Sequence, residues 1–316
     1  MSDIDRPRRR SSRRALLRTA GLLTAGLVSL GRVGAHASNQ TASGNPAAGK
    51  SELKPVAETY KTQAKGIRIL PGQWRPHYPW EHIAWVSPSW PSQDYIWLDF
   101  PEAIFTSQGL LFLSHINPPF PTVFSDLPQT PWRQIDGGIA FERELPNGMA
   151  FGGAVTKGAE RSVTLELYLR NGSTEKLAGI TLQTCAYLRA IKEFADYTND
   201  NKYVHLPNEG WISLTKALNH EPGPGKYRIG WRTSGKLMAD LPVVATVSSE
   251  ADRLVALSWG EHTLSIVGNP NHPCVHADPQ FPDLAPGETG RIHGRIAFFE
   301  GKLDSFHPQD HFDLGT

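Results

Sequence analysis

Four side chains that can bind a metal or move a proton stand at alternate positions near the end of this chain. They are His272, Cys274, His276 and Asp278. Side chains two residues apart in an extended segment project from the same side, so the four would share one face. Three prolines in the same stretch restrict its backbone and oppose pairing as a central strand. The pattern predicts a rigid, exposed loop over residues 269–279 that carries a functional site.

A divalent metal is one ligand that this segment could take, because imidazole, thiolate and carboxylate groups bind zinc, copper and iron. Side chains on one strand face are about 6.5–7 Å apart, so two or three of them at most can reach one ion. The candidate metal ligands are His272, His276 and Asp278. A complete site needs a ligand from elsewhere, for which His115 is the first candidate. Two further candidates are His82 and His205. The alternative is structural: the histidines bond loop carbonyls and Asp278 caps a turn.

The same groups could instead transfer protons. An imidazole near its ordinary pKa exchanges protons at neutral pH, and His115 or His276 would take that role. Asp278 or Asp94 would orient the catalytic imidazole. This interpretation requires the first half of the chain to meet the 269–279 segment in space.

Five tryptophans fall within 24 residues, namely Trp74, Trp80, Trp85, Trp90 and Trp97. Flat aromatic faces beside polar groups suit sugar rings. The cores of large β-sandwiches also use tryptophan, so we expect about half of these five side chains to lie in the core. We expect Trp90, which lies between two Pro-Ser pairs, to be exposed. Tyr95 and Trp97 share a strand face with Asp99, opposite a face that is apolar. The candidate substrate-binding residues are Tyr95, Trp97, Trp90, Asn271 and Arg189.

Strand patterns dominate the rest of the chain. Apolar and polar residues alternate over 163–170, and the Asn147-Gly148 dipeptide between two apolar runs predicts a hairpin. Only residues 188–196 have a helical pattern. Further strands are expected at 82–88, 94–100, 109–115, 227–232, 242–248, 253–259, 263–268 and 291–299. We therefore predict an all-β fold, a large antiparallel β-sandwich with little helix.

The run from Ser162 to Leu188 is a long strand, an Asn-Gly-Ser-Thr turn and a second long strand. This pattern resembles the sheet hairpins of the galactose mutarotase-like supersandwich proteins, which bind or process carbohydrates. The resemblance covers about a tenth of the chain and includes no catalytic signature. It implies a supersandwich architecture and a saccharide ligand, and it assigns no residue roles.

The beginning of the chain predicts export. Residues 1–37 combine arginines, an apolar run too short to span a membrane, and a small-x-small cleavage signal. Residues 12–18 resemble the twin-arginine export signal of bacteria, and an ordinary secretory peptide rich in arginine is the alternative. Residues 38–64 predict a flexible linker, and residues 65–316 a single β-sandwich domain. The expected location is the periplasm or the cell exterior.

Charge and cysteine content narrow the possible partners. The chain has 32 Lys+Arg and 31 Asp+Glu, and residues 1–37 hold 8 basic and 2 acidic groups, so the remainder carries a charge of about −5. Such a charge argues against nucleic acid as a partner. No later stretch is long and apolar enough for a transmembrane segment. Cys185 and Cys274 could pair in an oxidising compartment, although Cys185 lies in an apolar run typical of a buried thiol.

Together, these patterns predict an exported carbohydrate-active protein whose saccharide lies in a cleft lined by aromatic side chains and histidines. The chemistry could be that of an epimerase, a lyase or a hydrolase. One alternative is a non-catalytic envelope module that binds a glycan or a protein. Another is a metal-dependent enzyme or metal carrier.

Overall fold

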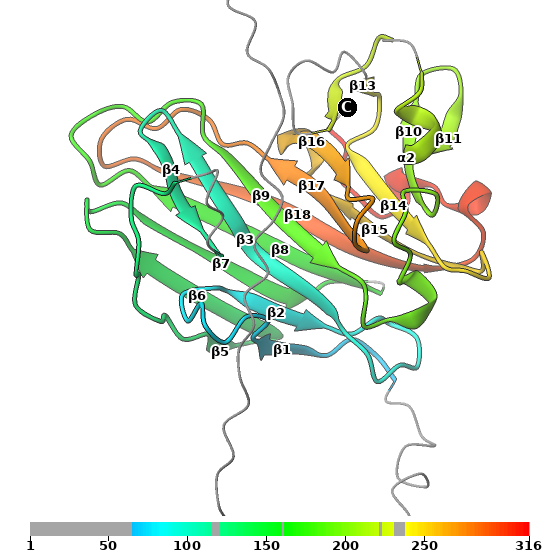
Figure 1. Ribbon diagram of the computed structural model, residues 1–316, viewed down its shortest axis with the longest axis horizontal. Helices are drawn as coiled ribbons and strands as arrows, with labels where there is room; N and C mark the ends of the chain where they lie inside the picture. Colours follow the sequence, from blue (N-terminus) through cyan, green and yellow to red (C-terminus); the bar gives the residue numbers. More distant parts are fainter. Residues whose placement is uncertain (1–64, 116–120, 160, 221–222, 231–237, 316) are drawn as a thin grey trace, which may run out of the picture. The chain divides into compact units, whose positions relative to one another are not determined.

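The computed structural model describes residues 65–115, 121–159, 161–220, 223–230 and 238–315. The signal peptide and linker expected over residues 1–64 lie outside the described residues. Within the described part, the chain forms two β-sheets of nine strands each (Figure 1).

Sheet A contains the strand that begins at Cys274. Its order is β1-β2-β3-β9-β17-β16-β12-β13, and β4 also pairs with β3. These strands are β1 (Ile69–Gly72), β2 (Ile83–Val86), β3 (Ile96–Thr106), β4 (Gly109–Leu113), β9 (Thr181–Tyr187), β12 (Tyr227–Ile229), β13 (Met238–Ala239), β16 (Thr263–Gly268) and β17 (Cys274–Pro279). All neighbours are antiparallel except β12 and β16.

Sheet B is antiparallel throughout, in the order β11-β10-β14-β15-β18-β8-β7-β6-β5. Its strands are β5 (Arg133–Ile135), β6 (Gly138–Glu144), β7 (Ala150–Lys157), β8 (Ser162–Arg170), β10 (Lys202–Leu206), β11 (Gly210–Ser213), β14 (Val243–Val247), β15 (Arg253–Ser258) and β18 (Thr289–Glu300). β6 and β7 form the hairpin predicted around Asn147-Gly148.

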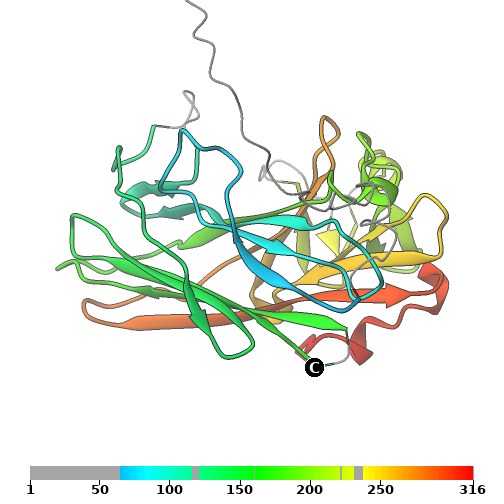
Figure 2. The same ribbon diagram turned by 90° about the horizontal axis from the view of Figure 1, so that it is seen from below.

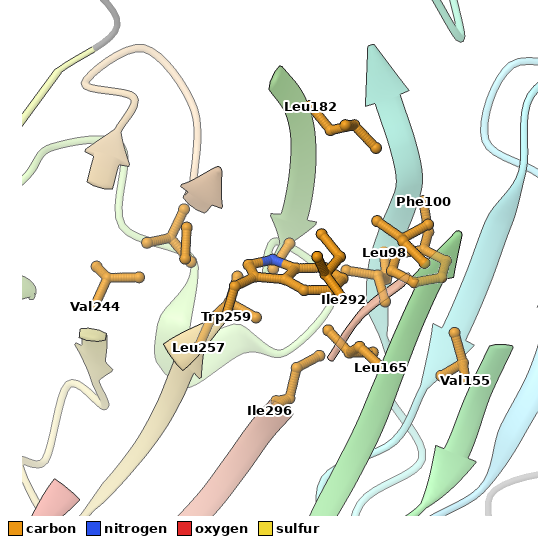
Figure 3. Close-up of a cluster of buried hydrophobic side chains, with 14 of the residues drawn as sticks. Leu98, Phe100, Val155, Leu165, Leu182, Val244, Leu257, Trp259, Ile292 and Ile296 are labelled. Carbon is orange, nitrogen blue, oxygen red and sulfur yellow. The ribbon is translucent and has the colours of Figure 1, made fainter. Parts of the chain in front are cut away.

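The two sheets pack face to face, as the side view in Figure 2 shows, and the hydrophobic core lies between them. Trp259 is fully buried near the centre of that core and stacks on Phe100 of sheet A, with ring centroids 6.1 Å apart. In Figure 3 its indole also lies beside Leu165 and Ile292 of sheet B. Since the core residues come from both sheets, the predicted large antiparallel β-sandwich is confirmed.

The predicted pairing of the 162–188 segment is wrong. β8 pairs with β7 and β18 in sheet B, whereas β9 pairs with β3 and β17 in sheet A. The Asn171 side chain donates hydrogen bonds to the carbonyls of Glu175 and Leu284, and these bonds fix the crossing between the two layers. The Asn-Gly-Ser-Thr sequence is therefore an inter-sheet connection and not a hairpin turn.

The predicted helix over 188–196 is also wrong, since this segment contains only the single 3₁₀ turn η1 (Lys192–Phe194). Phe194 is buried, so one apolar anchor holds a short turn against the sandwich. The short α-helix α2 (Leu214–Ala217) is capped by Ser213, whose side chain accepts a hydrogen bond from the Lys216 amide. Three more 3₁₀ turns in the described residues are η2 (Gly260–His262), η3 (Leu303–Ser305) and η4 (Pro308–Asp310). None of the helices in the described ranges has the length and apolar character of a membrane span.

Candidate functional site

The alternating segment near the end of the chain is a central strand. β17 pairs with β16 on one side and β9 on the other, and all six of its residues are buried. The predicted exposed loop is therefore wrong for residues 274–279, because the prolines stand at the ends of the strand and leave its centre free to pair. Pro270 and Asn271, before the strand, are exposed as predicted. The predicted alternation is confirmed: Val275 and Ala277 enter the core, and the intervening side chains face the other way. Those outward side chains are Cys274, His276 and Asp278.

β3 brings two carboxylates to the same outer face of sheet A. Asp99 is completely buried, and the Glu102 side chain is 15% exposed. The pairing of β3 with β9 changes register between Asp99 and Ala103. Such a bulge re-aims side chains, and here Glu102 reaches the β17 histidine. One Glu102 oxygen, Oε2, lies 3.8 Å from the Nδ1 atom of His276.

Arg75 forms hydrogen bonds to three segments of the chain: the segment before β2, strand β3 and the residue after β4. Its Nη1 atom donates hydrogen bonds to Asp99 at 3.1 Å and to Glu81 at 3.0 Å. The hydroxyl of Ser114, directly after β4, donates to the same Asp99 oxygen at 2.7 Å. Glu81 also accepts the backbone amide of Trp74 at 2.6 Å. The segment before β2 is therefore fixed to β3 by buried ionic hydrogen bonds.

Glu102 lies between two histidines from distant parts of the chain. Its Oε1 atom is 3.9 Å from Nδ1 of His115, and its Oε2 atom is 3.8 Å from Nδ1 of His276. The same His276 nitrogen is 3.4 Å from Oδ1 of Asp278. Three residues predicted from opposite halves of the sequence, His115, His276 and Asp278, therefore meet around a carboxylate that the sequence analysis did not select.

Burial sets the protonation states at this cluster. It lowers the pKa of His115 to about 4, an effect that the positive charge of Arg75 reinforces. It also raises the pKa of Asp99 to about 7, although the nearby Arg75 opposes this shift. The pKa of Glu102 is raised for the same reason, with a partial offset from His276. At neutral pH His115 is an uncharged base beside acids that hold their protons unusually well.

Both cysteines lie under this cluster and are buried free thiols. Cys274 Sγ is 3.4 Å from Nε2 of His276. A hydrogen bond from Cys185, and the charge of His276, lower the pKa of Cys274 although burial opposes ionisation. For His276, burial favours the neutral ring, but the negative charges of Cys274 and Asp278 raise its pKa well above the ordinary value.

Within the part of the chain that the structure describes, two groups of side chains have donor atoms close enough for a metal ion. Cys185, Cys274 and His276 form one, and Asp99, Glu102 and His115 the other; within each, the donor atoms lie within 4.8 Å of one another. The sequence-based set of His272, His276 and Asp278 differs from both. His276 is the one residue that the predicted set shares with the first group. The thiol of Cys185 comes from the neighbouring strand β9, so spacing along a single strand could not reveal it.

Aromatic rings cover the thiol side of the cluster. Trp74 stacks on Tyr187, with centroids 4.5 Å apart and planes 19° apart, and meets the edge of Trp97 at 6.0 Å. The two tryptophans are partly buried and pack against Tyr187, Cys185 and Cys274. The ring of His272 lies 5.7 Å from Tyr187. The predicted substrate-binding residue Trp97 thus shares a sheet face with the acid–base groups.

Other predicted site residues lie elsewhere. Asp94 is exposed just before β3, and the hydroxyl of Tyr95 accepts a hydrogen bond from Arg68. Asn271 is exposed in the turn before β17. Arg189 is exposed and hydrogen-bonds to Tyr187, which raises the pKa of the guanidinium.

The prediction for Trp90 is wrong. Its side chain is 2% exposed and packs against Phe194 and Phe298, with centroid distances of 6.0 and 5.6 Å. Flanking prolines and serines indicate that the backbone forms a loop, but they do not determine whether the side chain is exposed. Burial of a large indole in the core stabilises the fold, even when the indole comes from a loop.

The two weaker histidine candidates contact groups other than Glu102. His82 is completely buried against Phe141, at a ring distance of 3.8 Å. His205 pairs with Asp240 at 2.7 Å.

Four residues of the site were not predicted from the sequence, namely Arg75, Glu81, Glu102 and Ser114. One signal for Glu102 was available: residues 96–105 are apolar apart from Asp99 and Glu102. Carboxylates inside an apolar strand are rarely buried unless they have partners, so both deserved selection. Arg75 gave no such signal, because its segment has no regular period.

Comparisons with known proteins give structural likenesses only. No protein-family model matches the chain, and no curated protein does. Among solved structures, the Slr1438 protein of Synechocystis sp. PCC 6803 is 8% identical, covers 76% of this chain and 98% of its own, and has a TM-score of 0.40. A GalM/aldose epimerase homologue from C. elegans is 9% identical, with coverages of 76% and 100% and a TM-score of 0.38. At these identities and TM-scores the likenesses carry no function to this chain.

Proposed function

We propose that this chain is a carbohydrate-active protein that transfers protons on a saccharide at the outer face of β3, β9 and β17. The observation that carries the proposal is the position of Glu102 between His115 and His276, on a sheet face that also presents Trp74 and Trp97. A carboxyl group beside an imidazole can give one proton and take another. Tryptophan faces suit the apolar C–H faces of a sugar ring.

In this proposal Glu102 is the acid and His115 the base. Both side chains retain some exposure, 15% for Glu102 and 25% for His115, so both can reach a ligand at the surface. Their separation of 3.9 Å leaves room to tighten when a substrate binds. His276 is nearly completely buried and acts by positioning Glu102.

The geometry favours epimerase or lyase chemistry over hydrolysis. Glycoside hydrolysis commonly uses two carboxyl groups that flank the scissile bond. The two carboxylates near Glu102 are both buried: Asp99 is completely buried and bonded to Arg75 and Ser114, and Asp278 is 3% exposed. One accessible carboxyl with a neutral imidazole is instead an acid–base pair for moving protons on a sugar.

The test uses a panel of sugars, uronates and oligosaccharides, and NMR follows each compound after the protein is added. Entry of solvent deuterium into the sugar and exchange between isomers would report an epimerase, and unsaturated products would report a lyase. Glu102→Gln and His115→Ala should each lower turnover by about 10²–10⁴-fold, the usual contribution of a general acid or base. Glu142→Gln, on the exposed outer face of β6, is the matched control and should retain turnover. Equal activity of Glu102→Gln and the control would refute the assignment.

A non-catalytic glycan-binding module is the second candidate, favoured by the aromatic group of Trp74, Trp97 and Tyr187. Titration with the same panel separates the two. Binding that Trp97→Ala weakens and Trp211→Ala does not, with no turnover by any assay, would support this alternative. If no saccharide binds, both candidates fail.

Export to the periplasm by the twin-arginine route is also part of the proposal, and it rests on residues 1–37 alone.

A further inference from the structure

Two thiols and an imidazole converge on the outer face of sheet A beneath the aromatic rings. Cys185 of β9 stands directly opposite His276 of β17 in the strand register, and Cys274 precedes His276 by two residues. Opposed residues on neighbouring strands place their Cβ atoms about 4.5–5.5 Å apart, within reach of a shared ion. We propose that Cys185, Cys274 and His276 form a zinc-binding site.

The distances suit tetrahedral zinc. Zinc–sulfur bonds of about 2.3 Å and zinc–nitrogen bonds of about 2.0–2.1 Å place sulfur and nitrogen ligands about 3.6 Å apart. Cys274 Sγ and Nε2 of His276 are 3.4 Å apart. All three donor atoms lie within 4.8 Å of one another. Two thiolates and one imidazole, with a fourth position left for a small ligand, is a donor set found in catalytic zinc sites.

The surroundings of His276 match those of a metal ligand. Zinc-bound histidines usually donate their second N–H group to a carboxylate, which fixes the ring. Here Nε2 faces Cys274, and Nδ1 lies 3.4 Å from Asp278. Asp278 is itself held by the backbone amide of Thr184, which donates a hydrogen bond of 3.2 Å to its Oδ1 atom. The proton would therefore stay on Nδ1 and leave Nε2 for the ion.

A disulfide fits the same two cysteines less well. Cys185 is opposite His276, whereas Cys274 is opposite Tyr187, so the cysteines are diagonal neighbours across the two strands. Diagonal neighbours are about 7–8 Å apart, and a disulfide needs Cα atoms within about 7 Å.

Trp74 and Trp97 pack against both cysteines and shield them from solvent, which is the apolar shell typical of a metal site.

The experiment measures metal content of the full chain, purified from zinc-supplemented medium, by mass spectrometry. Wild type should hold zinc in a molar amount close to that of the protein. Cys185→Ser and Cys274→Ser should lose it, and His276→Gln should too. His205→Gln, a histidine of β10 paired with Asp240, is the matched control and should keep the zinc. Asp278→Asn removes no ligand and should weaken zinc affinity by about 10–100-fold.

A second measurement needs no variant. Wild-type protein reconstituted with Co²⁺ should show thiolate-to-cobalt charge-transfer absorption and the strong visible bands of tetrahedral cobalt. Zinc content equal to that of the cysteine variants, or a cobalt spectrum without thiolate charge transfer, would overturn the proposal. A disulfide between Cys185 and Cys274 in the folded protein would do the same. Neither measurement uses a saccharide, so the site can fail while the proposed function stands, or the reverse.

Discussion

Acid should destabilise this protein in part through His82, and replacement of that residue should remove that part of the effect. His82 is completely buried at the start of β2, stacked on Phe141 and close to Phe112 and Phe151. Neither of its ring nitrogens has a hydrogen-bond partner among the described residues. Burial, with a further contribution from the positive charge of Arg143, lowers the pKa of His82 well below its ordinary value.

The size and sign of the effect follow from proton linkage. The folded protein keeps His82 neutral, whereas the unfolded chain takes up a proton below about pH 6.5. Above that pH this histidine makes no difference to the free energy of unfolding. Below it, stability falls by about 1.4 kcal/mol for each pH unit, until the pH reaches the pKa of the folded state. Between pH 7.5 and 5.5 the loss is therefore about 1.4 kcal/mol, or roughly 2–5 °C in melting temperature for a chain of this size.

The assay is thermal and urea unfolding of wild type and His82→Phe at pH 7.5 and 5.5. The change between the two pH values is the readout, because any packing cost of the larger ring is present at both and cancels. His77→Phe makes the same replacement at an exposed histidine and should retain the wild-type pH dependence. If His82→Phe loses as much stability in acid as wild type does, His82 is not the neutral buried group described here.

Three further predictions concern the site and export. Arg75→Met leaves buried carboxylates without their cation and should cost about 3–5 kcal/mol in urea unfolding. Arg291→Met, at an exposed pair, should cost under about 1 kcal/mol. Burial lowers the pKa of His115 to about 4. A base with that pKa is uncharged above pH 4, so turnover measured against pH should fall on the acid side near pH 4. A fall near pH 6.5 would contradict the role of His115 as the base. Arg13→Lys combined with Arg14→Lys should keep the chain in the cytoplasm on cell fractionation, and normal export would refute a twin-arginine signal.

The sequence was sufficient for the all-β fold class and for the two faces of β17, but not for every strand, since β1, β5, β10, β11, β13 and β17 were not among the predicted strands. Period-two alternation in β17 correctly separated Val275 and Ala277 from the outward side chains, because alternation depends only on local geometry. Alternation could not predict whether the outward face of β17 is exposed to solvent. That exposure depends on the flanking strands β9 and β16, which are distant in sequence, so a buried central strand was mistaken for a loop.

Turn chemistry predicted one connection correctly and another incorrectly. Asn147-Gly148 joins the paired strands β6 and β7, whereas Asn171-Gly172 lies between strands of different sheets. The difference comes from a tertiary contact, the bond from Asn171 to the Leu284 carbonyl, which local sequence does not contain. The site hypothesis required His115 to meet His276 but could not establish that it does, and the bulge that turns Glu102 toward both could be seen only in the structure.

The two proposals meet at His276, and its two nitrogens keep them separable. Nε2 faces Cys274 and Nδ1 faces Asp278 and Glu102, so one ring links the thiols to the acid–base pair. A zinc ion on Nε2 would hold the Nδ1 proton in place and so fix the ring that positions Glu102. Zinc and saccharide chemistry would then share one rigid histidine without sharing a reacting atom. Replacing His276 affects both properties, whereas replacing Cys274 tests the ion and replacing Glu102 tests the proton transfer.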